Sequence, residues 1–266
     1  MKLAAIVLLL LAFGARQACA AEYHESIPYL DDPSHASITF TKAPAPSVYA
    51  SAAVSSTAQG QMVYTFDVNG AQPDSYVPVN FAGTYKMVFQ GDVPGLGQGR
   101  WSMLGASFYS GYFDVDGGFH FEGVKFSAGC NRINTGGCDV ESLGSMPPST
   151  YSKIELSNTK IGAASILGEF GGTLYIPINS KGDAVGVVNL FAFAGSFGLQ
   201  STSFIDPRLQ IDEAWLAAHP GVTITLPDGV GNATSPVPEP SSYLLLLAGL
   251  CLIGGVFTRR STLRRI

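Results

Sequence analysis

The stretch Gln61-Met-Val-Tyr-Thr-Phe-Asp-Val-Asn69 alternates apolar and polar residues with a period of two, and Asn69-Gly70 then offers a turn. This alternation is typical of a half-buried β-strand. The same period recurs in Val77–Phe81 and Tyr85–Phe89, with a Gly-containing turn between the two. The segment from residue 61 onward therefore begins as a series of short antiparallel strands.

Working outward, similar runs separated by turns predict eight to ten strands in all. Besides those above, the runs are 101–115, 119–126, 151–156, 172–178, 184–194 and 222–226. One helical turn is expected at Asp212–Pro220, because Asp212 can cap its start and Pro220 can stop it. Many short strands with almost no amphipathic helix predict an all-β fold, a single β-sandwich or jelly-roll-like domain over residues 61–228. Residues 21–60 are predicted to form a loosely structured N-terminal arm.

The amino terminus has the organisation of a signal peptide, residues 1–20. Lys2 precedes an apolar segment, and Ala18-Cys19-Ala20 is a small-x-small cleavage site, so cleavage is expected between Ala20 and Ala21. Without both termini the body keeps nine basic and nineteen acidic residues, a net charge near −10. Such an acidic surface argues against binding nucleic acid.

Two cysteines remain in the body once the signal peptide and the carboxyl-terminal tail are set aside. Cys130 and Cys138 have seven residues between them. In an exported chain this spacing indicates a disulfide that closes a small loop. A metal site is the alternative, but only His120 lies nearby and the spacing matches no zinc pattern.

The carboxyl terminus combines three blocks. A Pro-rich linker, 229–242, contains Pro238-Glu239-Pro240; an uncharged apolar run, 243–258, follows; and a basic tail, 259–266, ends the chain. The apolar run is short but long enough for a transmembrane helix. Arginines such as Arg259 and Arg260 favour the cytoplasmic side, so the body is expected outside. A plain single-span anchor with a Pro-rich linker is the alternative.

This arrangement resembles the PEP-CTERM sorting signal of Gram-negative bacteria, in which Val-Pro-Glu-Pro, an apolar helix and an Arg cluster follow one another. The resemblance implies an inner-membrane precursor that an exosortase, a membrane-embedded transpeptidase-like enzyme, processes. It passes the protein toward the cell surface or extracellular matrix. Pro238, Glu239, Pro240, Arg259 and Arg260 would be the sorting-signal residues.

The body is also similar to other exported PEP-CTERM proteins, over short segments only. These are Tyr64-x-Phe66-x-Val68-x-Gly70, Val77-Pro78-Val79, Asp206-Pro207, Ile211-Asp212 and Gly229-Val230-Gly231-Asn232. That group implies no activity. Asn232-Ala-Thr also fits a glycosylation pattern, and we expect it to belong to an exposed stalk.

No catalytic, metal or cofactor site is predicted. There is no Gly-x-Ser-x-Gly elbow, and His24, His35, His120 and His219 are scattered singly. Asp114-Val-Asp116-Gly117 could hold calcium, although a plain β-turn is favoured. The acids considered for a glycosidase pair are Glu122, Glu141, Glu155 and Glu169.

The function expected from the sequence is therefore that of a non-enzymatic exported surface or matrix protein. A carbohydrate-binding module for exopolysaccharide is the alternative, and a polysaccharide-acting enzyme is a third. Binding would require exposed aromatic rings on one face of the sandwich. The candidate rings are Trp101, Tyr109, Tyr112 and Tyr175, but we expect most of them in the core, because an all-β domain of this size must bury its aromatic side chains.

Overall fold

The structure is a computed structural model that separates into two compact units, Met1–Ala233 and Thr234–Ile266. It describes residues 21–90, 100–113, 118–131, 138–145, 151–162, 165–197 and 200–232, all in the first unit. The signal peptide, the apolar run at 243–258 and the sorting-signal residues lie outside the described residues. Within the described part of the chain, no helix is long and apolar enough to cross a membrane.

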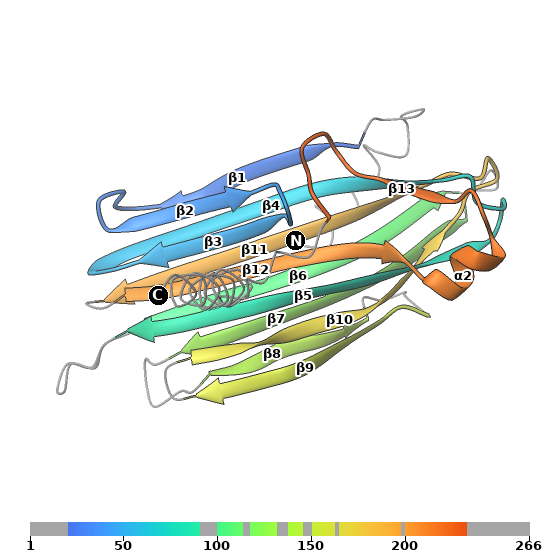
Figure 1. Ribbon diagram of the computed structural model, residues 1–266. Coiled ribbons are helices and arrows are strands. Elements are labelled where there is room, and N and C mark those ends of the chain that lie inside the picture. Colours follow the sequence, from blue (N-terminus) through green and yellow to red (C-terminus); the bar gives the residue numbers. More distant parts are fainter. Residues whose placement is uncertain are drawn as a thin grey trace, which may run out of the picture. The chain divides into compact units, whose positions relative to one another are not determined.

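Two antiparallel sheets form the first unit (Figure 1). Sheet A has the strand order β1-β4-β11-β6-β7-β8, with β13 also paired to β4. Its strands are β1 Tyr23–Leu30, β4 Ser55–Asn69, β6 Arg100–Phe113, β7 Phe119–Asn131, β8 Cys138–Ser145, β11 Ala184–Phe197 and β13 Thr223–Thr225.

Sheet B has the order β2-β3-β12-β5-β10-β9. Its strands are β2 Ala36–Thr41, β3 Ser47–Ala52, β5 Tyr76–Gln90, β9 Lys153–Gly162, β10 Ser165–Pro177 and β12 Gln200–Ile211. The two sheets face each other, with β3 against β4, β11 against β12, β7 against β10 and β8 against β9. Accordingly, strands of the two sheets alternate from top to bottom in Figure 1. The all-β sandwich prediction is confirmed.

Alternation along the strands builds the core between the sheets. In β4, Met62, Tyr64, Phe66 and Val68 are buried, as the period-two pattern predicts. Four phenylalanines from both sheets meet at its centre. Their ring centroids lie 4.2 Å apart for Phe81–Phe108, 4.7 Å for Phe126–Phe170 and 6.0 Å for Phe108–Phe170.

One glycine is required by this packing. Gly186 on β11 lies opposite Phe66 on β4, and a Cβ atom at Gly186 would stand 2.0 Å from the Phe66 ring. The ring thus occupies the space that any side chain at position 186 would need. A side chain at position 186 would therefore force the fully buried Phe66 ring out of a close-packed interior.

One edge strand of each sheet is irregular, β1 in sheet A and β9 in sheet B. On β9 the pairing with β10 shifts register next to Asn158, whose φ is +50°. On β1 the pairing with β4 shifts between Ser26 and Tyr29, around Pro28. Bulges and prolines at edges oppose association with further strands.

The prediction of a loose arm over residues 21–60 is wrong, because β1, β2, β3 and the start of β4 lie there. Strand β3 was missed since its residues are small, yet Val48, Ala50 and Ala52 are all fully buried. Small side chains give a weak apolar signal but pack well beneath a neighbouring sheet.

The helical turn is confirmed as α2, Glu213–Ala218, with Asp212 as its N-cap. The Asp212 carboxylate accepts a hydrogen bond from the Trp215 N–H at 2.9 Å. The helix ends at His219, immediately before Pro220.

Candidate functional site

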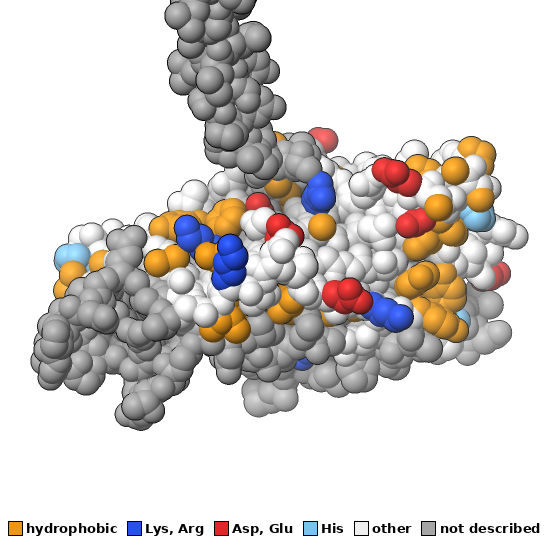
Figure 2. Space-filling model, turned by 60° about the horizontal axis from the view of Figure 1, so that its bottom comes forward, with side chains coloured by type: hydrophobic (Ala, Val, Ile, Leu, Met, Phe, Trp, Pro, Cys, Tyr) orange, Lys and Arg blue, Asp and Glu red, His pale blue; other side chains and the backbone are white. Residues whose placement is uncertain are grey.

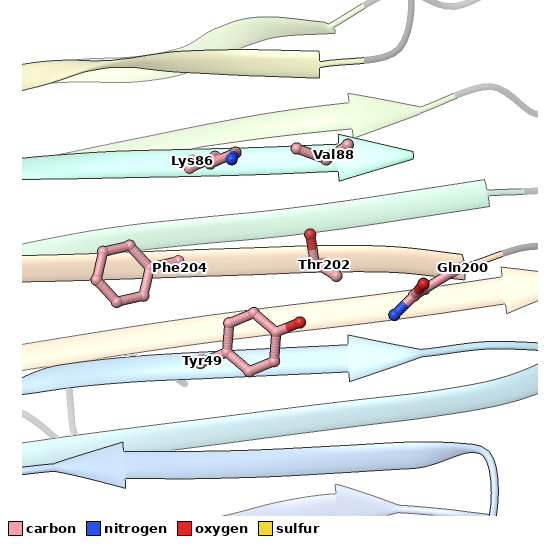
Figure 3. Close-up of a pocket in the computed structure, with 6 residues that line it drawn as sticks. All are labelled: Tyr49, Lys86, Val88, Gln200, Thr202 and Phe204. Carbon is pink, nitrogen blue, oxygen red and sulfur yellow. The ribbon is translucent and has the colours of Figure 1, made fainter. Parts of the chain in front are cut away.

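The outer face of sheet B carries a groove of about 360 Å³ (Figure 3). It lies across three neighbouring strands, β3, β12 and β5. Its lining residues are Tyr49, Lys86, Val88, Gln200, Thr202 and Phe204. Lys86 is exposed, and the other five side chains are half-buried.

The register explains why these side chains gather. Phe204 lies directly opposite Tyr49 on one side and Lys86 on the other. The same row continues outward, since Lys86 is opposite Leu167, and Leu167 is opposite Lys160. Side chains directly opposite one another share a face of the sheet. We call these five residues the aromatic–lysine row.

The row places two rings and two ammonium groups on the same face of sheet B. Neighbouring strands are about 4.8 Å apart, so Lys86 and Lys160 are roughly 10 Å apart at the backbone. In the described part of the chain, neither lysine has a carboxylate within ion-pair distance. Rings and free cations together suit a ligand with apolar C–H faces and negative charges.

The acids of the adjoining row are engaged with neighbouring side chains. The Asp206 carboxylate accepts hydrogen bonds from the Thr84 N–H at 2.8 Å and the Thr84 hydroxyl at 2.6 Å. Burial raises the pKa of Asp206, against the effect of the Thr84 hydrogen bonds. Glu169 accepts a hydrogen bond from the Asn158 amide at 2.8 Å.

A second aromatic group, the tyrosine cluster, comprises Tyr76, Tyr151 and Tyr175 near the opposite end of sheet B. Tyr151 is central, with ring centroids 5.6 Å from Tyr76 and 6.2 Å from Tyr175. It is also the most exposed described tyrosine, at 54%. Tyr76 and Lys86 both lie on β5, and ten residues of strand correspond to about 33 Å.

Glu122 holds the tyrosine cluster from beneath. Its carboxylate is buried and accepts hydrogen bonds from the backbone N–H groups of Tyr151, at 3.2 Å, and Ser152, at 2.9 Å. The pKa of the Tyr76 hydroxyl is raised by burial, then by the charges of Glu122 and Tyr151. Glu122 therefore has a structural contact that accounts for its burial.

Among the rings considered for a carbohydrate-binding platform, those that the structure describes do not share one face. Tyr109 is 5% exposed on sheet A beside Phe121, and burial raises its pKa to about 12. Tyr112 is stacked on His120, with ring centroids 4.8 Å apart. Of these described candidate rings, only Tyr175 belongs to the tyrosine cluster. The Trp101 side chain lies outside the described part. Sequence periodicity could not tell which sheet each ring would join.

The remaining carboxylates considered for catalysis do not face one another across a described cleft. Glu155 and Glu169 are exposed on the outer face of sheet B, whereas Glu122 points into the interior. The side chain of Glu141, together with Asp114 and Asp116, lies outside the described residues. The described chain contains no group of three or more potential metal ligands.

Asp32, Ser34 and His35 come close in a turn but lack the geometry of a catalytic triad. Both the Asp32 carboxylate, at 2.7 Å, and the Ser34 hydroxyl, at 2.9 Å, contact the same nitrogen, His35 Nδ1. A triad needs the serine and the acid on opposite ring nitrogens. Hydrogen bonds from Ser34, then His35, lower the pKa of Asp32 to about 2. These contacts are those of a hydrogen-bonded turn.

The side chain of His219 packs against α2. Its ring lies 4.0 Å from that of Trp215, and Nδ1 is 2.8 Å from the Trp215 carbonyl oxygen. It thus terminates α2.

The cysteine pair falls on adjacent strands. Cys130 on β7 lies directly opposite Cys138 on β8. Their side chains lie outside the described part, so the disulfide stays a prediction. The backbone register is compatible with it, because residues directly opposite in an antiparallel pair have Cα atoms about 4.5–5.5 Å apart.

The charges on the face shown in Figure 2 are few and scattered. Basic and acidic groups are interspersed, in one place side by side, and form no continuous basic surface on this face.

Comparison with known proteins identifies the tail. Residues 236–265 match the family described as the PEP-CTERM protein-sorting motif. This motif marks an exported protein that is briefly anchored in a membrane before an exosortase processes it.

Beyond the tail, the comparisons show no family for this chain. No curated protein matches the chain. Among solved structures, the chain is similar to one described as "Structure of infectious bursal disease virus Gt strain", with 11% identity and a TM-score of 0.08. The match covers 85% of this chain and 47% of that chain, and so low a TM-score carries no argument about fold or function.

Proposed function

We propose that this chain is a non-enzymatic protein of the cell surface or extracellular matrix. The observation that carries the proposal is the sorting motif at residues 236–265. In the precursor, Pro238-Glu239-Pro240 presents the processing site, because two prolines exclude helix and leave an extended segment. The apolar run at 243–258 holds the chain in the inner membrane, and Arg259 and Arg260 keep the tail cytoplasmic.

Intact mass tests this role directly. The protein is recovered from membrane and extracellular fractions, beside a variant in which Pro238, Glu239 and Pro240 are changed to Ala. We expect a wild-type species ending near residues 237–242 that the variant lacks. A full-length tail in both would contradict processing and leave an ordinary single-span anchor.

We further propose that the β domain binds an acidic polysaccharide along the outer face of sheet B. Support comes from two aromatic sites on one face, the groove and the tyrosine cluster, about 33 Å apart along β5. A polymer can contact both sites at once, whereas a small sugar can occupy only one. The domain is acidic overall, but the two lysines of the aromatic–lysine row have no ion pair among the described residues and give this row a local positive charge. This local charge favours a polysaccharide that carries carboxylates or sulfates.

The binding test uses a soluble polyuronate, with an uncharged glucan as the comparison. Changing Tyr49 and Phe204 together to Ala, or Tyr151 alone to Ala, should weaken polyuronate binding about fivefold or more. Changing Lys86 and Lys160 together to Gln should remove most of the salt dependence. Tyr29→Ala is the matched control, because Tyr29 is 50% exposed but lies on the edge of sheet A. Equal loss in the control, or no polyuronate binding, would contradict the proposal.

A further inference from the structure

One side of β12 is left open partway along its length. The strand pairs with β5 from Gln200 to Ile211, but with β3 only from Ser201 to Ile205. Beyond that point Pro207 has no N–H to donate, which suits a strand whose neighbour has ended. Leu209 follows two residues later and offers both its N–H and its carbonyl on the open side.

Asn232 occupies this open position. Its side-chain oxygen accepts a hydrogen bond from the Leu209 N–H at 2.6 Å, and its amide group donates to the Leu209 carbonyl oxygen. One asparagine side chain thereby supplies both hydrogen bonds that a paired strand residue would make. Buried backbone N–H and carbonyl groups need hydrogen-bond partners, and Asn232 supplies one to each of these two groups of Leu209.

The residues before Asn232 also contact the β domain. Val230 is buried, and the Gly231 N–H donates to the Lys42 carbonyl at 2.7 Å. A Cβ atom at Gly231 would stand 2.1 Å from the Pro44 carbonyl oxygen, so the position accepts only glycine. We call residues 229–232 the latch. These residues are the last part of the β domain and do not belong to the linker predicted for residues 229–242.

We propose that the latch sets how much free chain separates the folded domain from the sorting motif, and that processing depends on this length. Six residue steps lead from Asn232 to Pro238, which span at most about 20 Å when extended. If the latch opens, the last buried residue before it is Pro227, and eleven steps from there to Pro238 span about 38 Å. The latch therefore shortens the reach of the motif by nearly half.

This inference rests on the proposed processing by an exosortase. A membrane-embedded enzyme must reach an extended tripeptide while a folded domain stands nearby. With the latch closed, only a short spacer separates Asn232 from Pro238. Shortening this spacer further should let the folded domain block access of the enzyme to the motif.

The test combines a deletion with opening of the latch in the full-length chain. Removing residues 233–235 should reduce the processed fraction severalfold. Adding Gly231→Ala should restore it, because the opened latch releases residues 228–232. Gly171→Ala is the matched control, since its Cβ would meet only ordinary contacts, the nearest at 3.4 Å; it should not restore processing.

Latch opening is measured separately by hydrogen exchange of the Leu209 amide and by thermal melting. Gly231→Ala should speed that exchange about tenfold or more while the domain stays folded. The inference is overturned if the deletion alone is harmless, if Gly231→Ala fails to rescue it, or if Leu209 exchange is unchanged. A wild-type chain that is never processed refutes the proposed sorting function instead, and Leu209 exchange then still decides whether the latch exists.

Discussion

Replacing Cys130 and Cys138 with serine should destabilise the mature β domain by about 2.5 kcal/mol. The register places the two residues directly opposite each other on β7 and β8, so a bridge needs no backbone movement. A bridge there closes a loop of about eight residues. In the chain-entropy model, a loop of that length stabilises the folded state by roughly 2.5 kcal/mol at 25 °C.

Urea denaturation of the secreted protein measures the loss, and the melting temperature should fall by about 5–10 °C for a domain of this size. Reductant should produce the same loss in wild type and none in the double-serine variant. Thiol counting after denaturation is decisive, because Cys19 and Cys251 leave with the signal peptide and the tail. Two free thiols in the mature protein, or a variant as stable as wild type, would refute the reasoning.

Three other predictions concern single side chains in the described domain. Gly186→Ala should cost about 2–3 kcal/mol through its overlap with Phe66, and Phe66→Leu in the same chain should recover part of it; additive losses in denaturation would count against this packing. Glu122→Ala should cost about 2–4 kcal/mol by leaving the Tyr151 and Ser152 N–H groups unpaired, and Glu122→Gln less, since it keeps one acceptor; equal losses would argue against the hydrogen bonds. Burial, then the charge of Asp183, raises the pKa of Asp67 from 3.8 in the folded state. The folded state therefore binds the proton more tightly than the unfolded state, and its stability falls as pH rises from the unfolded pKa through the higher folded pKa. Asp67→Asn should lessen the fall, and a melting-temperature difference from wild type that is constant from about pH 4 to 7 would contradict this.

The fold class followed from periodicity, and the reason is visible in β4. Each alternate side chain from Met62 to Val68 is large and apolar, so the buried face could be identified without any partner strand. The cap at Asp212 was predictable for a similar reason, because capping depends on residues three positions apart.

The candidate site depends instead on pairing between distant segments. Tyr49, Phe204 and Lys86 belong to three strands, and only the register brings them into one row. Periodicity indicates which face of its own strand a residue occupies, but not which strand lies beside it. The role of Asn232 could not be predicted for the same reason, because its hydrogen-bond partner Leu209 lies on another segment, β12, whose unpaired side is not visible in the local sequence.

The placement of β11 and β12 has a consequence for how the chain is assembled. β11 lies between β4 and β6, and β12 lies between β3 and β5, so each sheet has its middle filled by a strand from late in the sequence. Until residues 184–211 arrive, both sheets have a gap with unpaired strand edges on either side. Folding dominated by such distant pairings is slow, and incomplete sheets are prone to accept foreign strands. The same gap makes the domain a candidate for fragment complementation, in which a separate peptide of residues 184–211 would complete a chain that lacks them.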